Sequence, residues 1–208
     1  MSVTSKFAGL ALSIGFAVIS SGCVSGDKNP PPPKPSKPHK VHVVGTIKAS
    51  TYTSSEGGFS VPVPVSPEVG GRVLRDGPQT VTFTDNWGSR ITFTSQPILP
   101  TSTMMQMVES QGREKALTEF AHREYGDMIA PHYHPDVREG MLTFIYLRPA
   151  SPKMGVAVFV HNYRLFLVES DMLPGVAVLG QNDLASDGDR DVWLEGVAIR
   201  LAQSITAN

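Results

Sequence analysis

One segment of the chain alternates threonine with large apolar side chains, and this alternation predicts a β-hairpin. Its two halves read QTVTFTD (residues 79–85) and SRITFT (residues 89–94). Because successive side chains of a strand point to opposite faces, the apolar positions of both halves would pair on one face and the threonines would lie on the other. Gly88 can supply the positive φ that the intervening turn needs. The paired apolar positions are Val81, Phe83, Ile91 and Phe93.

Further apolar runs extend this hairpin into a sheet. The segment 57–65 contains Pro62 and Pro64, which cannot donate to a strand ladder, so we expect an edge strand or the end of one. A turn at residues 161–163 would join the last two of the predicted strands. These additional strands are predicted at residues 41–48, 57–65, 141–147, 155–160 and 164–168.

The apolar period changes to that of a helix in two places. Residues 112–129 place apolar side chains near one helical face, and Pro131 would end that helix. A final helix would begin near Asp187 or Asp189. The resulting order of strands and helices predicts an α+β fold, a largely antiparallel β-sheet layered with two main helices. The inner side of the final helix would carry Val192, Leu194, Val197, Ala198, Leu201 and Ile205.

Two stretches resemble the PsbP-like and Mog-type domains. Residues 52–64 read YTSSEGGFSVPVP and residues 81–88 read VTFTDNWG. In that family an aromatic residue and a glycine lead into a strand that ends in proline, and a hairpin with an aspartate follows. The resemblance spans residues 52–205 and implies a PsbP-like sandwich. It also implies a function in binding partner proteins or assisting the assembly of membrane complexes, and some bacterial members are lipoproteins.

The first 22 residues have the order of a bacterial lipoprotein signal peptide. Lys6 precedes an apolar run at residues 7–19, and small residues lead into Cys23, the only cysteine. The segment before Cys23 resembles the lipobox, whose cysteine is acylated after cleavage at its amino side. The alternative is an ordinary signal peptide followed by a free thiol, but the polar flank cannot bury one. We therefore predict a membrane anchor at Cys23, and Val24 in place of an aspartate favours the outer membrane of a Gram-negative cell envelope.

Residues 23–40 predict a linker between the anchor and a single domain at residues 41–208. The stretch NPPPPKPSKPHK (residues 29–40) cannot form helix or sheet and favours polyproline II, although a Pro-rich recognition motif is an alternative. Five of the 18 Lys and Arg and one of the 19 Asp and Glu precede residue 41. The domain therefore carries 13 basic and 18 acidic residues, a formal charge of −5, which argues against nucleic acid as a partner.

His132 and His134 are the residues most suggestive of a metal site. Two imidazoles at this spacing point the same way only in an extended segment, where they could share a zinc or copper ion. The competing interpretation is a solvated loop, because Pro131 and Pro135 flank the pair. We predict the surface loop, with no metal and no other cofactor. A metal- or small-ligand-binding domain that uses this loop is the alternative.

Other patterns do not define a catalytic site. The alternating acids before the final helix are similar to half a calcium loop, but Val192 and Ala198 stand where that loop needs glycine and glutamate, so the acids predict a helix start. The sequence has no nucleophile elbow and no phosphate-binding loop, so we predict a non-enzymatic protein-binding or assembly module. Trp87 and Tyr163, at hairpin tips, would contact a partner or fold back over the sheet edge. The acids in question are Asp183, Asp187, Asp189 and Asp191.

Overall fold

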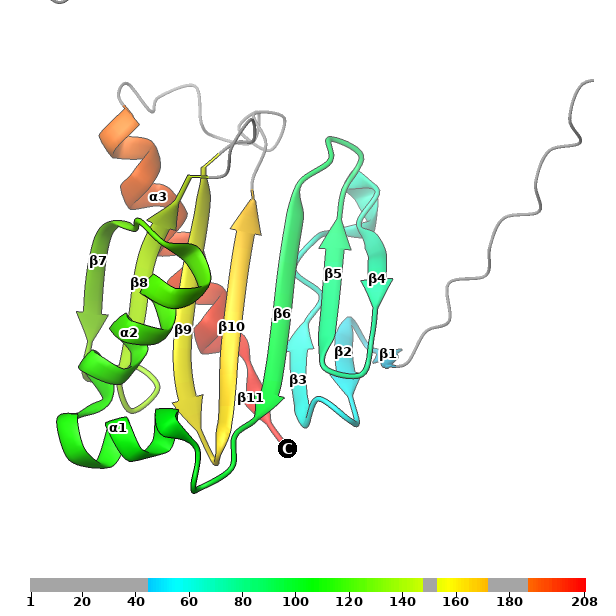
Figure 1. Cartoon of the computed structure of the whole chain (residues 1–208). Coiled ribbons are helices and arrows are strands. Elements are labelled where there is room, and N and C mark those ends of the chain that lie inside the picture. The colour runs from blue at the N-terminus through cyan, green and yellow to red at the C-terminus, as the bar shows by residue number, and fades with distance from the viewer. Residues whose placement is uncertain (1–44, 148–152, 172–186) are drawn as a thin grey trace, which may run out of the picture. The chain divides into compact units, whose positions relative to one another are not determined.

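The computed structural model describes residues 45–147, 153–171 and 187–208, with the side chains of residues 187–189 excepted. These residues form two antiparallel sheets, three α-helices and a 3-10 helix (Figure 1), so the fold is α+β as predicted. The elements in chain order are β1 (Thr46–Lys48), β2 (Thr51–Ser54), β3 (Phe59–Pro62), η1 (Pro67–Val69), β4 (Arg72–Asp76), β5 (Thr80–Thr84), β6 (Arg90–Pro97), α1 (Thr103–Gln111), α2 (Arg113–Tyr125), β7 (Ile129–His134), β8 (Met141–Tyr146), β9 (Met154–His161), β10 (Arg164–Asp171), α3 (Asp187–Ser204) and β11 (Thr206–Ala207).

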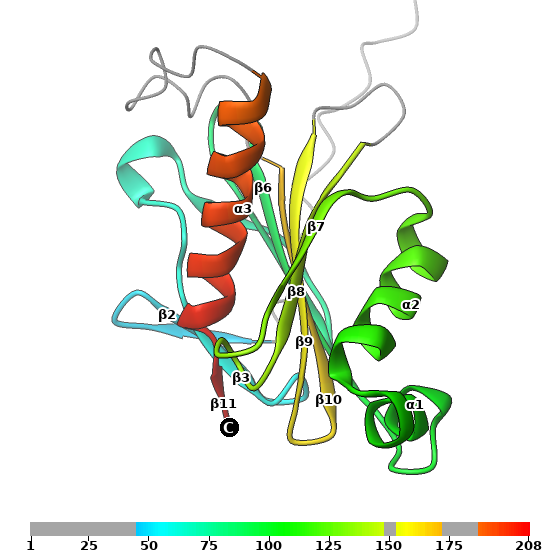
Figure 2. The same cartoon turned by 90° about the vertical axis from the view of Figure 1, so that its left-hand side faces the viewer.

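A seven-stranded sheet in the order β4-β5-β6-β10-β9-β8-β7 forms the central layer of the domain. Figure 2 shows α2 on one face of this sheet and α3 on the other, with the four-stranded sheet β1-β2-β3-β11 on the α3 side. In Figure 1, α1 and α2 lie over the β7–β9 part, whereas no described helix covers β4, β5 and β6 on that side. One half of the large sheet is therefore covered on both faces and the other half on one.

The central strands are apolar on both faces because both faces are covered. Phe159 and Phe166 stack at 4.9 Å between ring centroids and face the core beneath α3 and the small sheet. Their chain neighbours Val158 and Leu165 face the second core, beneath α2. Alternation along β9 and β10 thus divides the apolar side chains between two cores, which explains why these strands read as continuous apolar runs.

The predicted hairpin is confirmed as β5 and β6. Val81 pairs with Phe93 and Phe83 pairs with Ile91, and all four side chains are buried. On the opposite face, the hydroxyls of Thr82 and Thr92 lie 3.1 Å apart. The predicted strands at residues 141–147, 155–160 and 164–168 are likewise confirmed as β8, β9 and β10.

The prediction of two main helices matches only roughly, because three α-helices are present in the described part. The helix predicted at residues 112–129 is present as α2, and it is preceded by α1, which was not predicted and which meets α2 at Gly112, where φ is 89°. The second of them, α2, ends before Gly126, whose φ of 71° suits glycine. Pro131 does not end this helix but lies in β7, at the irregularity where an edge strand tolerates proline.

Helix α3 lies close to the sheet because β9 carries a glycine beneath it. A Cβ added at Gly155 would lie 2.5 Å from the backbone oxygen of Leu194, so no other residue fits without moving the helix. Leu194 and Ala198 are buried, as predicted for its inner side. Val192, predicted beside them, is 71% exposed, so that assignment is wrong.

The small sheet is held to the large one by apolar packing and by one buried tyrosine. Tyr52 on β2 lies edge-on to Phe83 and its hydroxyl donates to Asp76 on β4 at 2.6 Å. Burial, followed by this contact with a carboxylate, raises the pKa of Tyr52 far above its usual value. The predicted edge strand at residues 41–48 is confirmed as β1 for residues 46–48, and the strand at 57–65 ends at Pro62 as expected. Residues 41–44 lie outside the described part.

Candidate functional site

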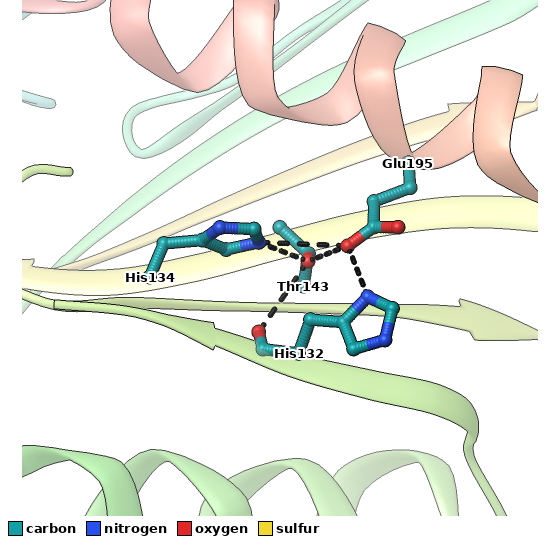
Figure 3. A network of polar contacts seen from close by, with 4 residues as sticks. All are labelled: His132, His134, Thr143 and Glu195. Atoms are coloured by element: carbon teal, nitrogen blue, oxygen red, sulfur yellow. Dashed lines mark hydrogen bonds and ion pairs between the residues drawn. The ribbon is translucent and has the colours of Figure 1, made fainter. Parts of the chain in front are cut away.

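His132 and His134 lie in the edge strand β7, so the predicted surface loop is wrong. Residue 132 pairs with Thr143 of β8, and residue 134 pairs with Met141. Because residues two apart in a strand share a face, both imidazoles reach the α3 side of the sheet. They meet Glu195 there, a residue that sequence reasoning did not single out (Figure 3).

Glu195 Oε1 is the centre of this polar network. It accepts from His132 Nδ1 at 2.8 Å and from the Thr143 hydroxyl at 2.7 Å, and it lies 3.5 Å from His134 Nε2. Since the Thr143 hydroxyl donates to the carboxylate, it accepts from His134 Nε2, which is 2.8 Å away. The four side chains therefore join β7 and β8 to α3.

The charge of Glu195 is stabilised although its side chain is only 16% exposed. Burial alone raises the pKa of this carboxyl, but hydrogen bonds from Thr143 and His132, with the charges of both imidazoles, lower it more. The net shift of the Glu195 pKa is downward, so the network favours the carboxylate.

The network holds protons where a metal ion would need lone pairs. A carboxylate only accepts hydrogen bonds, so the nitrogens that face Glu195 and Thr143 are N–H donors. Metal ligation requires these nitrogens to be unprotonated. Among the described residues, no group of three or more His, Cys, Asp or Glu could hold a metal ion. The arrangement thus offers no support for the metal-binding alternative, and it links a helix to an edge strand.

Of the acids predicted to start the final helix, Asp191 is the one whose side chain is described. It pairs with Lys153 at 2.8 Å, so it fastens α3 to the start of β9. The helix begins at Asp187, in agreement with the predicted helix start. The side chains of Asp187 and Asp189 are not described, and Asp183 lies outside the described residues.

Trp87 and Tyr163 are both exposed, by 44% and 56% of their surface, and they lie at opposite ends of the large sheet. The β6–β10 ladder runs through eight residue pairs, from Pro97–Arg164 at the Tyr163 end to Arg90–Asp171 at the Trp87 end. At about 3.4 Å per residue, the two tips are about 24 Å or more apart. They therefore belong to two separate surfaces (Figure 1).

The turn that carries Tyr163 is strained. Asn162 and Tyr163 have φ angles of 48° and 55° and connect the paired residues His161 and Arg164. This is the geometry of a type I′ turn, in which glycine is preferred at the second position. Within the described part of the chain, the ring and hydroxyl of Tyr163 have no hydrogen bond and no aromatic contact.

An exposed leucine lies beside this turn. The amide of Ile98 donates to the carbonyl of Tyr163 at 2.8 Å, which brings the segment after β6 against the hairpin tip. Leu99, the next residue, is 72% exposed. Leu99 and Tyr163 therefore form an apolar tip surface at one end of the domain, which we call the Tyr163 tip.

The predicted lipid attachment site lies outside the described residues. Cys23 and the linker that follows it belong to residues 1–44. Within the described ranges, no helix has the length and apolar character needed to cross a bilayer.

Comparison with known proteins finds similarity among solved structures and none in sequence. No protein-family model matches the sequence, and neither does any curated protein. Among solved structures, the chain is similar to cyanobacterial PsbP (CyanoP) from Synechocystis sp. PCC 6803, with a TM-score of 0.45 and 11% sequence identity. The match covers 76% of this chain and 91% of that one. A likeness of this size carries no inference about family or function, and the α+β class rests on the elements described above.

Proposed function

We propose that this protein is a lipid-anchored lipoprotein of the cell envelope whose PsbP-like domain binds a protein partner or assists in an assembly, without enzymatic activity. Acylated Cys23 would hold it in the membrane, which would be the outer membrane in a Gram-negative cell. The linker that ends at residue 40 would give the acidic domain reach from the bilayer. The sequence of residues 1–40 supports the anchor and the linker.

The observation that carries partner binding is the strained, exposed Tyr163. An L-residue in the left-handed region costs roughly 1–2 kcal/mol, and a tyrosine is an unusual choice where glycine would be free of strain. Within the described part of the chain, the Tyr163 side chain has no hydrogen bond, ion pair or ring contact that would offset this cost. A large aromatic side chain with adjacent apolar surface is the kind of group that anchors a protein interface. Partner contact through the Tyr163 tip therefore explains both the exposure and the strain.

Crosslinking in native membranes tests this proposal. Crosslinker-treated membranes that contain the wild-type chain should yield a specific captured protein, and the Tyr163→Gly variant should lose most of that capture. The Trp87→Ala variant is the matched control, because it removes an exposed aromatic from a tip at the other end of the sheet. Capture that survives Tyr163→Gly, or that depends on Trp87 instead, would contradict docking at the Tyr163 tip.

The anchor is tested separately by fractionation. Replacing Cys23 by serine removes the acylated thiol, so the variant should move from the membrane fraction to the soluble fraction of the envelope. Intact mass should show added lipid on the wild-type chain and none on the variant. A variant that stays with the membranes, together with a wild-type chain of unmodified mass, would overturn the anchor.

A further inference from the structure

The half of the large sheet that no described helix covers carries a cavity of about 550 Å³. Volumes in this range are typical of small-molecule sites. The cavity lies over β4, β5, β6 and β10, on the face opposite the small sheet, and its charged lining comes from β4, β6 and β10. It is distant in the fold from the histidine network, which joins β7 and β8 to α3.

The strand register arranges the lining in a row. Arg75 of β4 pairs with Thr82 of β5, which pairs with Thr92 of β6, which pairs with Glu169 of β10. Directly paired residues of an antiparallel ladder share a face. The four side chains thus run across the strands from a cation at one side, over two hydroxyls, to an anion at the other.

The two guanidinium groups of the cavity are uncommitted. Neither Arg75 nor Arg90 has a hydrogen bond or an ion pair with a described residue. Arg72 provides a contrast on the same strand, since it donates to the carbonyl of Gly70 at 3.0 Å and to the side chain of Asn86 at 3.3 Å. Two uncommitted guanidinium groups beside one cavity are suited to bind a carboxylate, which accepts two parallel hydrogen bonds from each.

The anionic side of the cavity, at β10, is held in place by a hydrogen bond from a helix. Glu169 accepts a hydrogen bond from the Tyr125 hydroxyl of α2 at 3.0 Å, which fixes its orientation. Asp171 is buried and pairs across the ladder with Arg90. The Glu169 carboxylate at this side is suited to bind an ammonium group. Leu74 and Met154 add apolar surface to the lining.

We propose that this cavity binds a short peptide with free ends. Its carboxylate would lie against Arg75 and Arg90, its ammonium group against Glu169, and its amides against the threonine hydroxyls. Small apolar side chains of the peptide would contact Leu74 and Met154. The two guanidinium groups and the Glu169 carboxylate of the lining match a zwitterion, whereas a simple anion would lie against the Glu169 carboxylate as well. This inference is independent of the Tyr163 tip and of the lipid anchor.

Calorimetric titration of the full chain with alanyl-alanine tests this site. We expect binding with a Kd of about 1 mM or tighter, weakened about tenfold or more in the Arg75→Gln/Arg90→Gln double variant. Arg72→Gln, on the same strand but outside the lining, should bind as the wild-type chain does. N-acetyl-alanyl-alanine lacks the ammonium group and alanyl-alanine amide lacks the carboxylate, so each should bind at least about tenfold more weakly.

Several results would overturn the site. Absence of binding by alanyl-alanine would do so, as would an affinity that the double arginine variant leaves unchanged. Equal binding of the acetylated dipeptide would show that an anion, and no zwitterion, is recognised. Because none of the substitutions touches a buried core residue, circular dichroism of the variants should match the wild-type chain and confirm that the fold is retained.

Discussion

Three turns of the described domain place two consecutive non-glycine residues at positive φ, and two of these turns carry large side chains with opposite surroundings. Between β7 and β8, Arg138 and Glu139 have φ angles of 54° and 60°. Between β9 and β10, Asn162 and Tyr163 have φ angles of 48° and 55°. The backbone strain is of the same kind in both turns, so the difference lies in what each strained side chain contacts.

The first turn is explained by contacts within the domain. Arg138 donates to the carbonyls of Ala202, Gln203 and Ile205 at the end of α3. Its guanidinium also lies over the ring of Phe159, and burial lowers its pKa.

Glu139 completes the contacts of this turn. It accepts from Arg113 at the start of α2 at 2.9 Å and contacts His161 at 3.1 Å. The two strained residues thus connect the helices on the two faces of the sheet to the same turn. Within the described residues the Tyr163 side chain has no hydrogen bond or ion pair of this kind, and this contrast is the basis of the proposed docking at the Tyr163 tip.

The largest effect is expected from Arg138→Ala. It leaves three carbonyls at the end of α3 without a charged donor and removes packing over Phe159. We expect the free energy of unfolding to fall by about 2–3 kcal/mol, measured by urea denaturation. Arg138→Lys keeps the charge but lacks the planar guanidinium group. Its free energy of unfolding should therefore lie between those of the wild-type chain and the alanine variant. A loss below about 0.5 kcal/mol for the alanine variant would remove the distinction between the turns.

The parts of the fold that sequence could predict are those set by local periodicity. Val81 and Phe83 alternate with threonines, and β5 and β6 pair as that alternation requires. The apolar runs of β8, β9 and β10 are long enough to be recognised without knowledge of their neighbours. By contrast, α1 was not predicted, and the helix predicted at residues 112–129 ends at Tyr125, before the positive φ of Gly126.

The polar sites could not be predicted because their partners are distant in the sequence. His132 and Glu195 are 63 residues apart, and no local pattern marks that glutamate, although its position next to Leu194 places it near the inner side of α3. Arg138 is 64 residues from the carbonyl of Ala202. The spacing of His132 and His134 predicts only that both rings share a face if the segment is an extended strand.

Glu195→Gln should have the next largest effect and should depend on pH. Its pKa is lowered in the folded state, so the stability that its charge contributes is present above its usual pKa, near 4.5, and is lost as pH falls through the folded value. We expect the variant to be less stable than the wild-type chain by about 1 kcal/mol at neutral pH, with the difference vanishing in acid.

Urea denaturation at a series of pH values measures this effect. Glu124→Gln, which changes an exposed carboxylate on α2, is the matched control. If the Glu195→Gln variant is less stable than the wild-type chain by the same amount at every acid pH, the network stabilises α3 without a contribution from the charge of Glu195. Arg138 and the Asp191–Lys153 pair would then be the charged contacts that hold this helix.

The smallest effect is expected from Tyr163→Gly, and its comparison with Arg138→Gly is the most direct test of the difference between the turns. Tyr163→Gly relieves the left-handed strain and removes no described hydrogen bond of that side chain, so the free energy of unfolding should rise by about 0.5–1 kcal/mol. Arg138→Gly relieves the same strain but removes the contacts to α3, so it should be destabilising. Tyr163→Ala keeps the strain and removes the ring, which separates the two effects: it should lose partner capture without the gain in stability. Thermal and urea denaturation of the three variants would show opposite signs at the two turns. If Tyr163→Gly instead destabilises the domain by more than about 0.5 kcal/mol, the tyrosine has a structural role in the fold, and its strain needs no partner to explain it.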